Sequence, residues 1–497
     1  MAPDPRRPRR VSVVDMTFGI WAVAIPPVFA FWLLNGDGDL ARHIVTGRYI
    51  LQHGPRFADP FSFTLPGRPF LAYEWLSQVA FALVERLLGL PGIAVLAGVL
   101  IAATLALVVD FVRADGGDPW LALVTGTVAA ALTSTFWIAR PHLFTFLGLA
   151  LLLRVLRSRH PALLTLPLFA IWANLHPGFL YGLVMLLLWE LGMAVEDLRR
   201  GDPWRFVLRA RLGPICAAAA ASLANPFGWQ LHAHALRLLG SHAVQVVYEF
   251  MPLPPLGPYG LMFLVALGIA VVGLAALREW PGWHVLLVFG AAVVAALASQ
   301  RNAPLCALFA LPVLARALRP TLELLPGWLA GRMRAEFARS DVHRKVAAPS
   351  ALVALVALLV LDGRLLPRRI LPAAFSSRVF PAAAVAEART QGLTGRLLSE
   401  YTWGGYVLYA WPGQRVFIDS MADFFGDDLL GEYRLMREAL GDWEALLAER
   451  DISLVLLPPE MPLVEELRRR PGWRLVHQDD VAVLLSREQP PPSREMP

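Results

Sequence analysis

The residues best suited to chemistry stand between Asn35 and His43, in the stretch NGDGDLARH that follows the first long apolar run. Asp37 and Asp39 flank one glycine and follow another, so the backbone can turn sharply and aim both carboxylates into one space. Such a pair suits two tasks: holding a divalent cation through oxygen ligands, or acting as a base beside a charged group. A simpler alternative is that Asp39 caps the following helix, which explains one aspartate and not both.

Other polar residues stand at the ends of further apolar runs. His43 follows Asp39 by four residues, so the two share one face of a helix. Glu74 begins a second apolar helix, and the chain between it and the aspartates is rich in Pro and aromatic residues, which predicts a loop that folds back. His176 stands in the segment NLHPG. We therefore treat His43, Glu74 and His176 as candidate substrate-binding residues.

Two arginines have the chemistry of phosphate binding. Arg140 lies in ARPH and Arg301 in SQRNAP, each beside an apolar run. A guanidinium at membrane depth suits a phosphate or diphosphate, which it can bind through two parallel hydrogen bonds. The alternative for each arginine is pairing with lipid headgroups.

The composition is that of a membrane protein. Of the 497 residues, 56% are hydrophobic and only 17% are charged, against about 25% charged in soluble domains. The net charge of +6 does not indicate a nucleic-acid partner, because the basic residues gather in short segments between apolar runs. Cys216 and Cys306 both lie inside apolar runs, so no disulfide framework is predicted.

Runs of about 20 apolar residues predict transmembrane helices. The expected spans are 14–34, 91–112, 119–138, 142–157, 161–174, 177–196, 206–224, 258–277, 282–299, 302–318 and 348–362. Residues 73–90 are apolar too, but if they lie along the interface all basic clusters fall on one side, as the positive-inside rule requires. The prediction is an α-helical, multi-pass protein of the cytoplasmic membrane with about 11 spans, its N-terminus inside and its C-terminus outside.

That orientation puts the polar ends on one face. The segments 35–43, 73–75, 139–142, 174–178, 223–229 and 299–304 all become outer ends. Ionisable groups at membrane depth tend to face a protein interior or a wet cavity, so the pattern favours one cavity open to the outside. The alternative is that these segments are ordinary turns, for which Asn-Pro and His-Pro-Gly are common material.

The chain resembles the GT-C membrane glycosyltransferases, which include polyprenyl-phosphate-sugar-dependent mannosyl- and arabinosyl-type transferases and the catalytic subunit of oligosaccharyltransferase. The resemblance rests on NGDGDLARH, DPFSF (59–63) and EW (74–75), on Arg140, and on many spans with a C-terminal outer domain. It implies a lipid-linked sugar donor, a glycan, lipid or protein acceptor, and inverting displacement. Carried over, Asp37 or Asp39 is the base or a ligand of a divalent cation such as Mg²⁺ or Mn²⁺, and Arg140 contacts the donor phosphate.

The chain after the last span predicts a small domain. Residues 1–362 form the expected transmembrane domain, with outer loops 35–90 and 225–257, and 363–487 form an extracytoplasmic α/β domain with a disordered tail at 488–497. Strands are expected at RLLSEY, GYVLYAW, RVFID, SLVLLP and RLVHQDDVAVLL, and helices at LLGEYRLMREAL and MPLVEELRRR.

One part of this domain distantly resembles the acceptor-binding region of oligosaccharyltransferase. The matching positions are Trp403, Gly405, Tyr406, Arg415 and Asp419. The paired tryptophans are absent, so recognition of a peptide sequon does not follow. The alternative is a buried strand pair with an Asp-capped turn.

Three functions follow from these patterns. The leading prediction is a glycosyltransferase that moves a sugar from a polyprenyl-phosphate donor to a cell-envelope acceptor. A transporter or flippase for a lipid-linked glycan would instead place its polar residues near the midplane and show inverted repeats. A noncatalytic scaffold with an outer binding domain would leave Asp37 and Asp39 without a role in any activity.

Overall fold

The computed structural model describes residues 13–114, 119–239, 248–277, 280–318, 327 and 373–488. The chain forms two compact units. The first takes its described residues from Met1–Leu33, Leu88–Ala233 and Val247–Pro372, and the second from Leu34–Leu87, His234–Val246 and Ala373–Pro497. The predicted domain boundary at residue 362 and the predicted span 348–362 lie outside the described residues.

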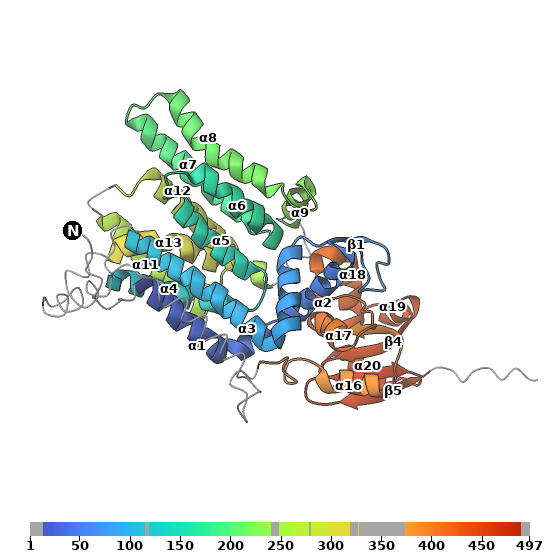
Figure 1. Ribbon diagram of the computed structural model, residues 1–497. Helices are drawn as coiled ribbons and strands as arrows, with labels where there is room; N and C mark the ends of the chain where they lie inside the picture. Colours follow the sequence, from blue (N-terminus) through green and yellow to red (C-terminus); the bar gives the residue numbers. More distant parts are fainter. Residues whose placement is uncertain are drawn as a thin grey trace, which may run out of the picture. The chain divides into compact units, whose positions relative to one another are not determined.

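The helices and 3-10 helices are the only regular secondary structure in the described residues of the first unit (Figure 1). The main helices that lie in it wholly or in part are α1 (Val13–Asn35), α3 (Trp75–Ala114), α4 (Pro119–Thr133), α5 (His142–Val155), α6 (Pro161–Leu175), α7 (Phe179–Arg199), α8 (Trp204–Ser222), α9 (Trp229–Leu239), α11 (Pro258–Ala276), α12 (Trp283–Ala298) and α13 (Ala303–Leu318). Three short 3-10 helices connect them: η1 (Ser134–Phe136), η2 (Tyr248–Phe250) and η3 (Gln300–Asn302).

Small residues let these helices approach closely. Helix α6 packs against α5 and α8, and α13 packs against α4, α11 and α12. Trp172 on α6 is 2% exposed and lies against two glycines: a Cβ would fall 2.6 Å from its ring at Gly148 and 2.5 Å at Gly182. Glycine at such positions permits the close helix contacts typical of membrane bundles.

Four described helices are long and apolar enough to cross a membrane by length and composition: Val13–Asn35, Trp75–Ala114, Phe179–Arg199 and Pro258–Ala275. Shorter apolar helices lie at Trp120–Phe136, His142–Val155, Pro161–Leu175 and Trp283–Ala298. Every predicted span from 14–34 to 302–318 falls on a described helix. The exact number of spans stays a prediction.

Helix α3 contains a break near the boundary that the sequence predicts between an interfacial segment and a membrane span. Gly89 has φ 68° and ψ −168°, which is outside the helical region, and Pro91 follows it. Glycine tolerates this conformation, and proline removes a backbone donor that a continuous helix would use. The helix therefore divides near the predicted boundary between an interfacial segment, 73–90, and a span, 91–112. The position of that segment at a membrane surface stays a prediction.

The second unit contains a sheet with helices. Its further elements are α2 (Asp39–His53), β1 (Arg56–Ala58), β2 (Pro69–Leu71), α16 (Ala382–Thr390), β3 (Arg396–Ser399), η5 (Tyr401–Trp403), α17 (Gly404–Ala410), α18 (Ala422–Arg437), α19 (Trp443–Glu449), β4 (Ile452–Leu457), α20 (Pro462–Arg469), β5 (Trp473–Gln478) and β6 (Val483–Arg487). The four-stranded sheet has the order β3-β4-β6-β5. Strands β3 and β4 are parallel, and the other pairs are antiparallel.

Residues 34–87 of this unit pack into one core with its C-terminal residues, 373–488. Strands β1 and β2 pair with each other and fold the loop between α2 and α3 back on itself. Beyond them, Val416 forms parallel bridges to Ser62 on one side and to Leu397 of β3 on the other. The Val416 amide donates to the Phe61 carbonyl at 3.1 Å. Ala41 and Phe61 also belong to the core cluster that contains Leu397 and residues of β4 and β6.

Two predicted strands are wrong. The stretch RVFID, 415–419, forms only the isolated bridges of Val416. The stretch GYVLYAW forms α17, Gly404–Ala410, instead of a strand. Short apolar runs do not distinguish a strand from a buried helix by their pattern alone. Here Gly404 and Gly405, the first two residues of α17, permit close contacts: a Cβ would lie 2.7 Å from the Asp419 Cβ at Gly404 and 2.8 Å from the Gly38 carbonyl oxygen at Gly405.

Candidate functional site

The Asp-Gly-Asp turn starts helix α2. Gly38 is at the N-cap, Asp39 is the first helical residue, and the Asp39 amide donates to Asp37 Oδ1 at 2.9 Å. The alternative that Asp39 caps the helix is therefore wrong, because Gly38 occupies the N-cap position and Asp39 is already helical. Both aspartates are half-buried. The carboxylate of Asp39 lies in the first turn, where the helix dipole favours negative charge.

Close backbone packing fixes this turn against the segment TWGG, Thr402 to Gly405. A Cβ on Gly38 would lie 1.8 Å from the Thr402 carbonyl oxygen. A Cβ on Gly405 would lie 2.8 Å from both the Gly38 carbonyl oxygen and the Arg42 Cβ. Neither position has room for a side chain, so both glycines are required by contact and not by turn conformation.

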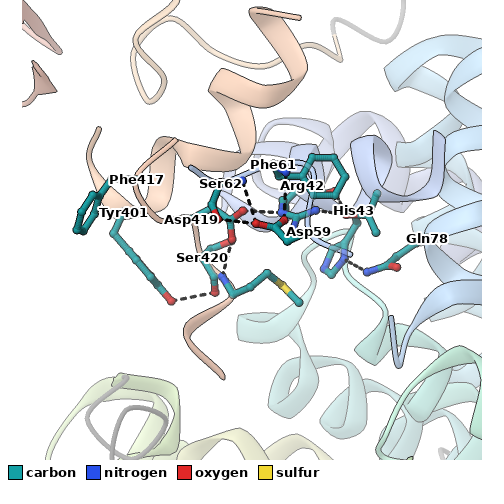
Figure 2. Close-up of polar contacts among 12 residues, drawn as sticks. Arg42, His43, Asp59, Phe61, Ser62, Gln78, Tyr401, Phe417, Asp419 and Ser420 are labelled. Atoms are coloured by element: carbon teal, nitrogen blue, oxygen red, sulfur yellow. Dashed lines mark hydrogen bonds and ion pairs between the residues drawn. The ribbon is translucent and has the colours of Figure 1, made fainter. Parts of the chain in front are cut away.

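A buried ion pair joins α2 to the segment that follows α17 (Figure 2). Arg42 Nε donates to Asp419 Oδ2 at 2.6 Å, and the two side chains are 1% and 0% exposed. The Met421 amide donates to the other Asp419 oxygen at 3.0 Å. Burial raises the pKa of the Asp419 carboxyl, while Arg42 and the Met421 amide act in the opposite direction.

Aromatic rings enclose the guanidinium of Arg42. Its central carbon lies 4.1 Å from the ring centroid of Phe61 and 5.2 Å from that of Phe70, which adds cation–π contacts to the ion pair. Asp59 holds the loop that carries Phe61: its carboxylate accepts the amides of Phe61 at 3.1 Å and Ser62 at 3.0 Å. The motif DPFS therefore orients a ring toward Arg42 (Figure 2).

His43 and Glu74, both chosen from the sequence, lie together in the second unit. His43 Nδ1 is 3.3 Å from Gln78 Nε2 and 3.7 Å from Glu74 Oε2. His43 is 4% exposed and Glu74 7%. The group joins α2 to the first turn of α3, so it fixes the two helices that flank the hairpin β1–β2. Gln78 was not identified from the sequence.

Four of the five positions that match the acceptor-binding region are buried in the second unit: Trp403, Gly405, Tyr406 and Asp419. The Trp403 Nε1 donates to the Val379 carbonyl at 3.1 Å, and Tyr406 stacks on Phe380 with ring centroids 4.9 Å apart. Asp419 binds Arg42, while Arg415 is exposed. These contacts place the motif in the core of the second unit, but as η5 and α17 and not as the strand pair that the alternative predicts; only its Asp-capped turn is present, at Asp419. A role in acceptor binding stays a prediction.

The two candidate phosphate-binding arginines meet on one carboxylate in the first unit. Arg140 Nη1 donates to Glu249 Oε1 at 3.0 Å, and Arg301 Nη1 lies 3.8 Å from Glu249 Oε2. The side chains are 19%, 30% and 24% exposed for Arg140, Arg301 and Glu249. Although burial raises the pKa of Glu249, the two arginines lower it more, to about 2.

Backbone contacts hold this cluster together, which we call the Arg140–Glu249–Arg301 cluster. The Ser299 hydroxyl donates to the Glu249 carbonyl at 3.2 Å, and the Gln300 amide donates to the Met251 carbonyl at 2.9 Å. The Arg301 guanidinium lies 4.8 Å from the ring centroid of Phe250. The 3-10 helices η2 and η3, which carry Glu249 and Arg301, are therefore held together by contacts other than the ion pairs.

His176 stabilises a turn in the first unit. Its Nδ1 accepts the Gly178 amide at 3.0 Å and lies 2.7 Å from the Thr145 hydroxyl, which in turn accepts Trp172 Nε1 at 3.0 Å. The Nδ1 side of the ring is thus used within the turn between α6 and α7. A substrate-binding role for His176 stays a prediction.

Sequence reasoning missed Arg42 and Glu249. Arg42 stands inside the quoted motif NGDGDLARH, but nothing nearby in the sequence indicates a carboxylate partner. Glu249 had a usable signal: the segment YEF at 248–250 repeats the pattern of YEW at 73–75, a glutamate between aromatic residues ahead of an apolar run.

A divalent cation has limited support from the described residues. Among them, no group of three or more His, Cys, Asp or Glu side chains could hold a metal ion. Asp37 and Asp39 provide two carboxylates, and one of the Asp37 oxygens already accepts the Asp39 amide. Mg²⁺ is commonly bound through one or two carboxylates together with substrate phosphates, so this pair fits a metal only with a substrate that completes the shell.

No family model and no curated protein sequence matches the chain. Solved structures do. The apo oligosaccharyltransferase of Archaeoglobus fulgidus aligns with TM-score 0.54 and 11% identity over 89% of this chain and 69% of that chain. ArnT from Cupriavidus metallidurans bound to undecaprenyl phosphate aligns with TM-score 0.52 and 13% identity over 95% and 97%.

A further structure, the A. fulgidus oligosaccharyltransferase AglB in complex with an inhibitory peptide and a dolichol-phosphate, aligns with TM-score 0.53 and 11% identity over 90% of this chain and 69% of that chain. Identities this low show the fold alone. The fold is that of the GT-C membrane glycosyltransferases, and the resemblance predicted from the sequence is confirmed at this level.

Proposed function

We propose that the protein is a membrane glycosyltransferase that moves a sugar from a polyprenyl-phosphate donor to a cell-envelope acceptor at the outer face, by inverting displacement. The fold neighbours include ArnT bound to undecaprenyl phosphate and AglB with a dolichol-phosphate, so a lipid phosphate is a ligand that proteins of this fold bind. Fold likeness alone does not imply a function, so the residues must carry the argument.

The observation that carries the proposal is the Arg140–Glu249–Arg301 cluster. Two arginines from loops more than 150 positions apart in the sequence converge on one carboxylate, in a part of the first unit that remains partly exposed. A phosphate, like a carboxylate, presents two acceptor oxygens side by side, and arginine binds both groups through paired hydrogen bonds. The cluster can therefore exchange its carboxylate for the donor phosphate.

The reaction needs few groups from the protein. The arginines bind the phosphate and stabilise the charge that develops on its oxygen as the bond to the sugar breaks. Asp37 or Asp39 accepts the proton of the acceptor hydroxyl as that oxygen attacks the anomeric carbon. The same two aspartates would be the ligands of a divalent cation, which would help to neutralise the phosphate charge.

The test measures transfer of radiolabelled sugar from polyprenyl-phosphate sugars to envelope material. Membranes carry the wild type, Asp37→Asn, Asp39→Asn or the control Asp428→Asn, whose side chain is exposed on α18. Removing a general base typically lowers the rate by about 10²–10⁴-fold. We expect that loss in at least one of the first two variants and none in the control.

Two results would count against the proposal. Unchanged transfer in both Asp37→Asn and Asp39→Asn would remove these carboxylates from the mechanism and favour a noncatalytic role for the loop. Transfer that persists in both Arg140→Ala and Arg301→Ala would show that these arginines do not bind the donor phosphate. Addition of EDTA to the wild type would show separately whether a divalent cation takes part.

A further inference from the structure

Glu249 limits the positive charge of the arginine cluster. Two guanidinium groups carry +2 in total, and the carboxylate between them leaves a net charge of +1. The Glu249 carboxyl keeps its negative charge at neutral pH because its pKa lies near 2. Glu249 was not among the residues chosen from the sequence, and the proposed transfer reaction gives it no task.

The charge of the carrier phosphate changes during the proposed reaction. In the donor the phosphate is a diester, joined to the lipid and to the sugar, and it carries one negative charge. When the acceptor oxygen bonds to the anomeric carbon, the bond from that carbon to the phosphate oxygen breaks and its electron pair stays on the phosphate, while the acceptor's proton goes to the aspartate base. The product is a monoester whose second pKa is near 6, so it is mostly a dianion at pH 7.5.

We propose that Glu249 makes the cluster discriminate between these two phosphates: it retains the singly charged donor and weakens retention of the doubly charged carrier that transfer releases. This inference rests on the proposed function. A cluster with a net charge of +1 balances the single negative charge of the diester. The second negative charge of the monoester is repelled by the Glu249 carboxylate. Without that carboxylate, two arginines would match the dianion and hold the spent carrier.

The size of the expected change in phosphate affinity follows from the short distances between the charged groups. The Glu249 oxygens lie 3.0 Å and 3.8 Å from the guanidinium nitrogens, so a phosphate on the same arginines would approach the carboxylate to within a few ångströms. At such a partly exposed position, removing one unit charge changes the affinity for a second unit charge by roughly tenfold. Removing the Glu249 charge therefore changes the ratio of the affinities for the monoester and the diester phosphate.

The experiment compares two lipids on the purified full-length chain in detergent. Undecaprenyl phosphate represents the dianionic product, and its methyl ester represents the monoanionic donor phosphate. Dissociation constants are measured by native mass spectrometry at pH 7.5 for the wild type, Glu249→Gln and the control Glu438→Gln. Glu438 pairs with Arg437 on α18 at 2.6 Å and is similarly exposed, at 33%.

We expect Glu249→Gln to raise the preference for the monoester over the methyl ester by roughly tenfold, and Glu438→Gln to leave it unchanged. The glutamine keeps the size of the side chain and one accepting oxygen, so loss of folding is not expected. Preference that is the same in Glu249→Gln and wild type would overturn the inference and leave the proposed function intact.

Binding that does not depend on the arginines would be a different failure. If Arg140→Ala and Arg301→Ala bind both lipids as tightly as the wild type does, the phosphate site itself is wrong, and the inference falls with it. The two sets of variants thus distinguish an error about Glu249 from an error about the function.

Discussion

Each unit contains an ion pair between an arginine and a carboxylate. In the second unit Arg42 and Asp419 are 1% and 0% exposed and lie 2.6 Å apart. In the first unit Arg140 and Glu249 lie 3.0 Å apart and are 19% and 24% exposed. The distances are similar, so burial is the main difference between the two pairs.

That difference decides which pair can change partners. Opening the buried pair would leave a charge in the protein core, which costs several kcal/mol. Opening the partly exposed pair lets water solvate each group, and a phosphate can replace the carboxylate on the arginine. Arg42 and Asp419 therefore stabilise the fold around the Asp37–Asp39 turn, whereas Arg140 and Glu249 have the properties of a binding site.

The largest expected effect tests the buried pair. Asp419→Ala leaves the Arg42 guanidinium unpaired in the core, and we expect the free energy of unfolding of the second unit to fall by about 3–5 kcal/mol. Hydrogen exchange of residues 34–87 and 373–488 under increasing denaturant measures this loss. Because both segments share one core, protection should fall in both together.

A double variant distinguishes the loss of the ion pair from the loss of side-chain volume. Arg42→Met with Asp419→Leu removes both charges and keeps apolar volume, so it should recover much of the stability that Asp419→Ala loses. A loss below about 1 kcal/mol in Asp419→Ala would contradict the comparison, since that is the range of exposed pairs.

The next effect concerns the contact beside this ion pair. In Gly405→Ala the new methyl group would lie 2.8 Å from the Gly38 carbonyl oxygen and from the Arg42 Cβ. We expect a loss of about 1–3 kcal/mol in the unfolding free energy, because the backbone must shift to make room. Gly431→Ala is the matched control: that helical position is open and should be neutral or gain stability. Equal changes in the unfolding free energy of the two variants would show that the close contact at Gly405 does not affect stability.

The arginines of the first unit should affect binding more than folding. We expect Arg140→Ala and Arg301→Ala each to lower kcat/KM for a polyprenyl-phosphate donor by about tenfold or more, through loss of a charge-assisted contact. The unfolding free energy should change by less than about 1 kcal/mol. Transfer kinetics and thermal unfolding measure the two quantities, with Arg434→Ala on α18 as the exposed control. A large loss of stability without a change in KM would make this pair structural, like Arg42 and Asp419.

The sequence predicts what depends on neighbours along the chain. Apolar runs of helical length marked the described helices of the first unit, because burial in lipid or in a bundle requires continuous apolar surface. Arg140 and Arg301 could be chosen as candidates as well, since an ionisable residue at membrane depth tends to face a protein interior or a wet cavity. Their role stays a prediction. The break at Gly89 follows from Gly and Pro in one short segment.

The sequence does not predict contacts between distant segments. Arg42 and Asp419 are separated by 377 positions, and neither segment indicates the other. The two glycines of TWGG could be interpreted as a turn or a strand start until the backbone of Gly38 is known to lie against them. The same long-range packing explains why GYVLYAW forms a helix, and why residues 34–87 and the C-terminal segment share a core.

The smallest expected effect extends the comparison to full exposure. Arg469 and Glu465 pair one turn apart on α20, and their side chains are 66% and 67% exposed. Water and salt screen such a pair, and both long side chains lose freedom when they are held together, so we expect Arg469→Ala to change the unfolding free energy by less than about 0.5 kcal/mol. Denaturant unfolding in low and high salt measures it. If this variant lost as much stability as Asp419→Ala, burial would not be the property that separates the structural ion pair from the exchangeable one.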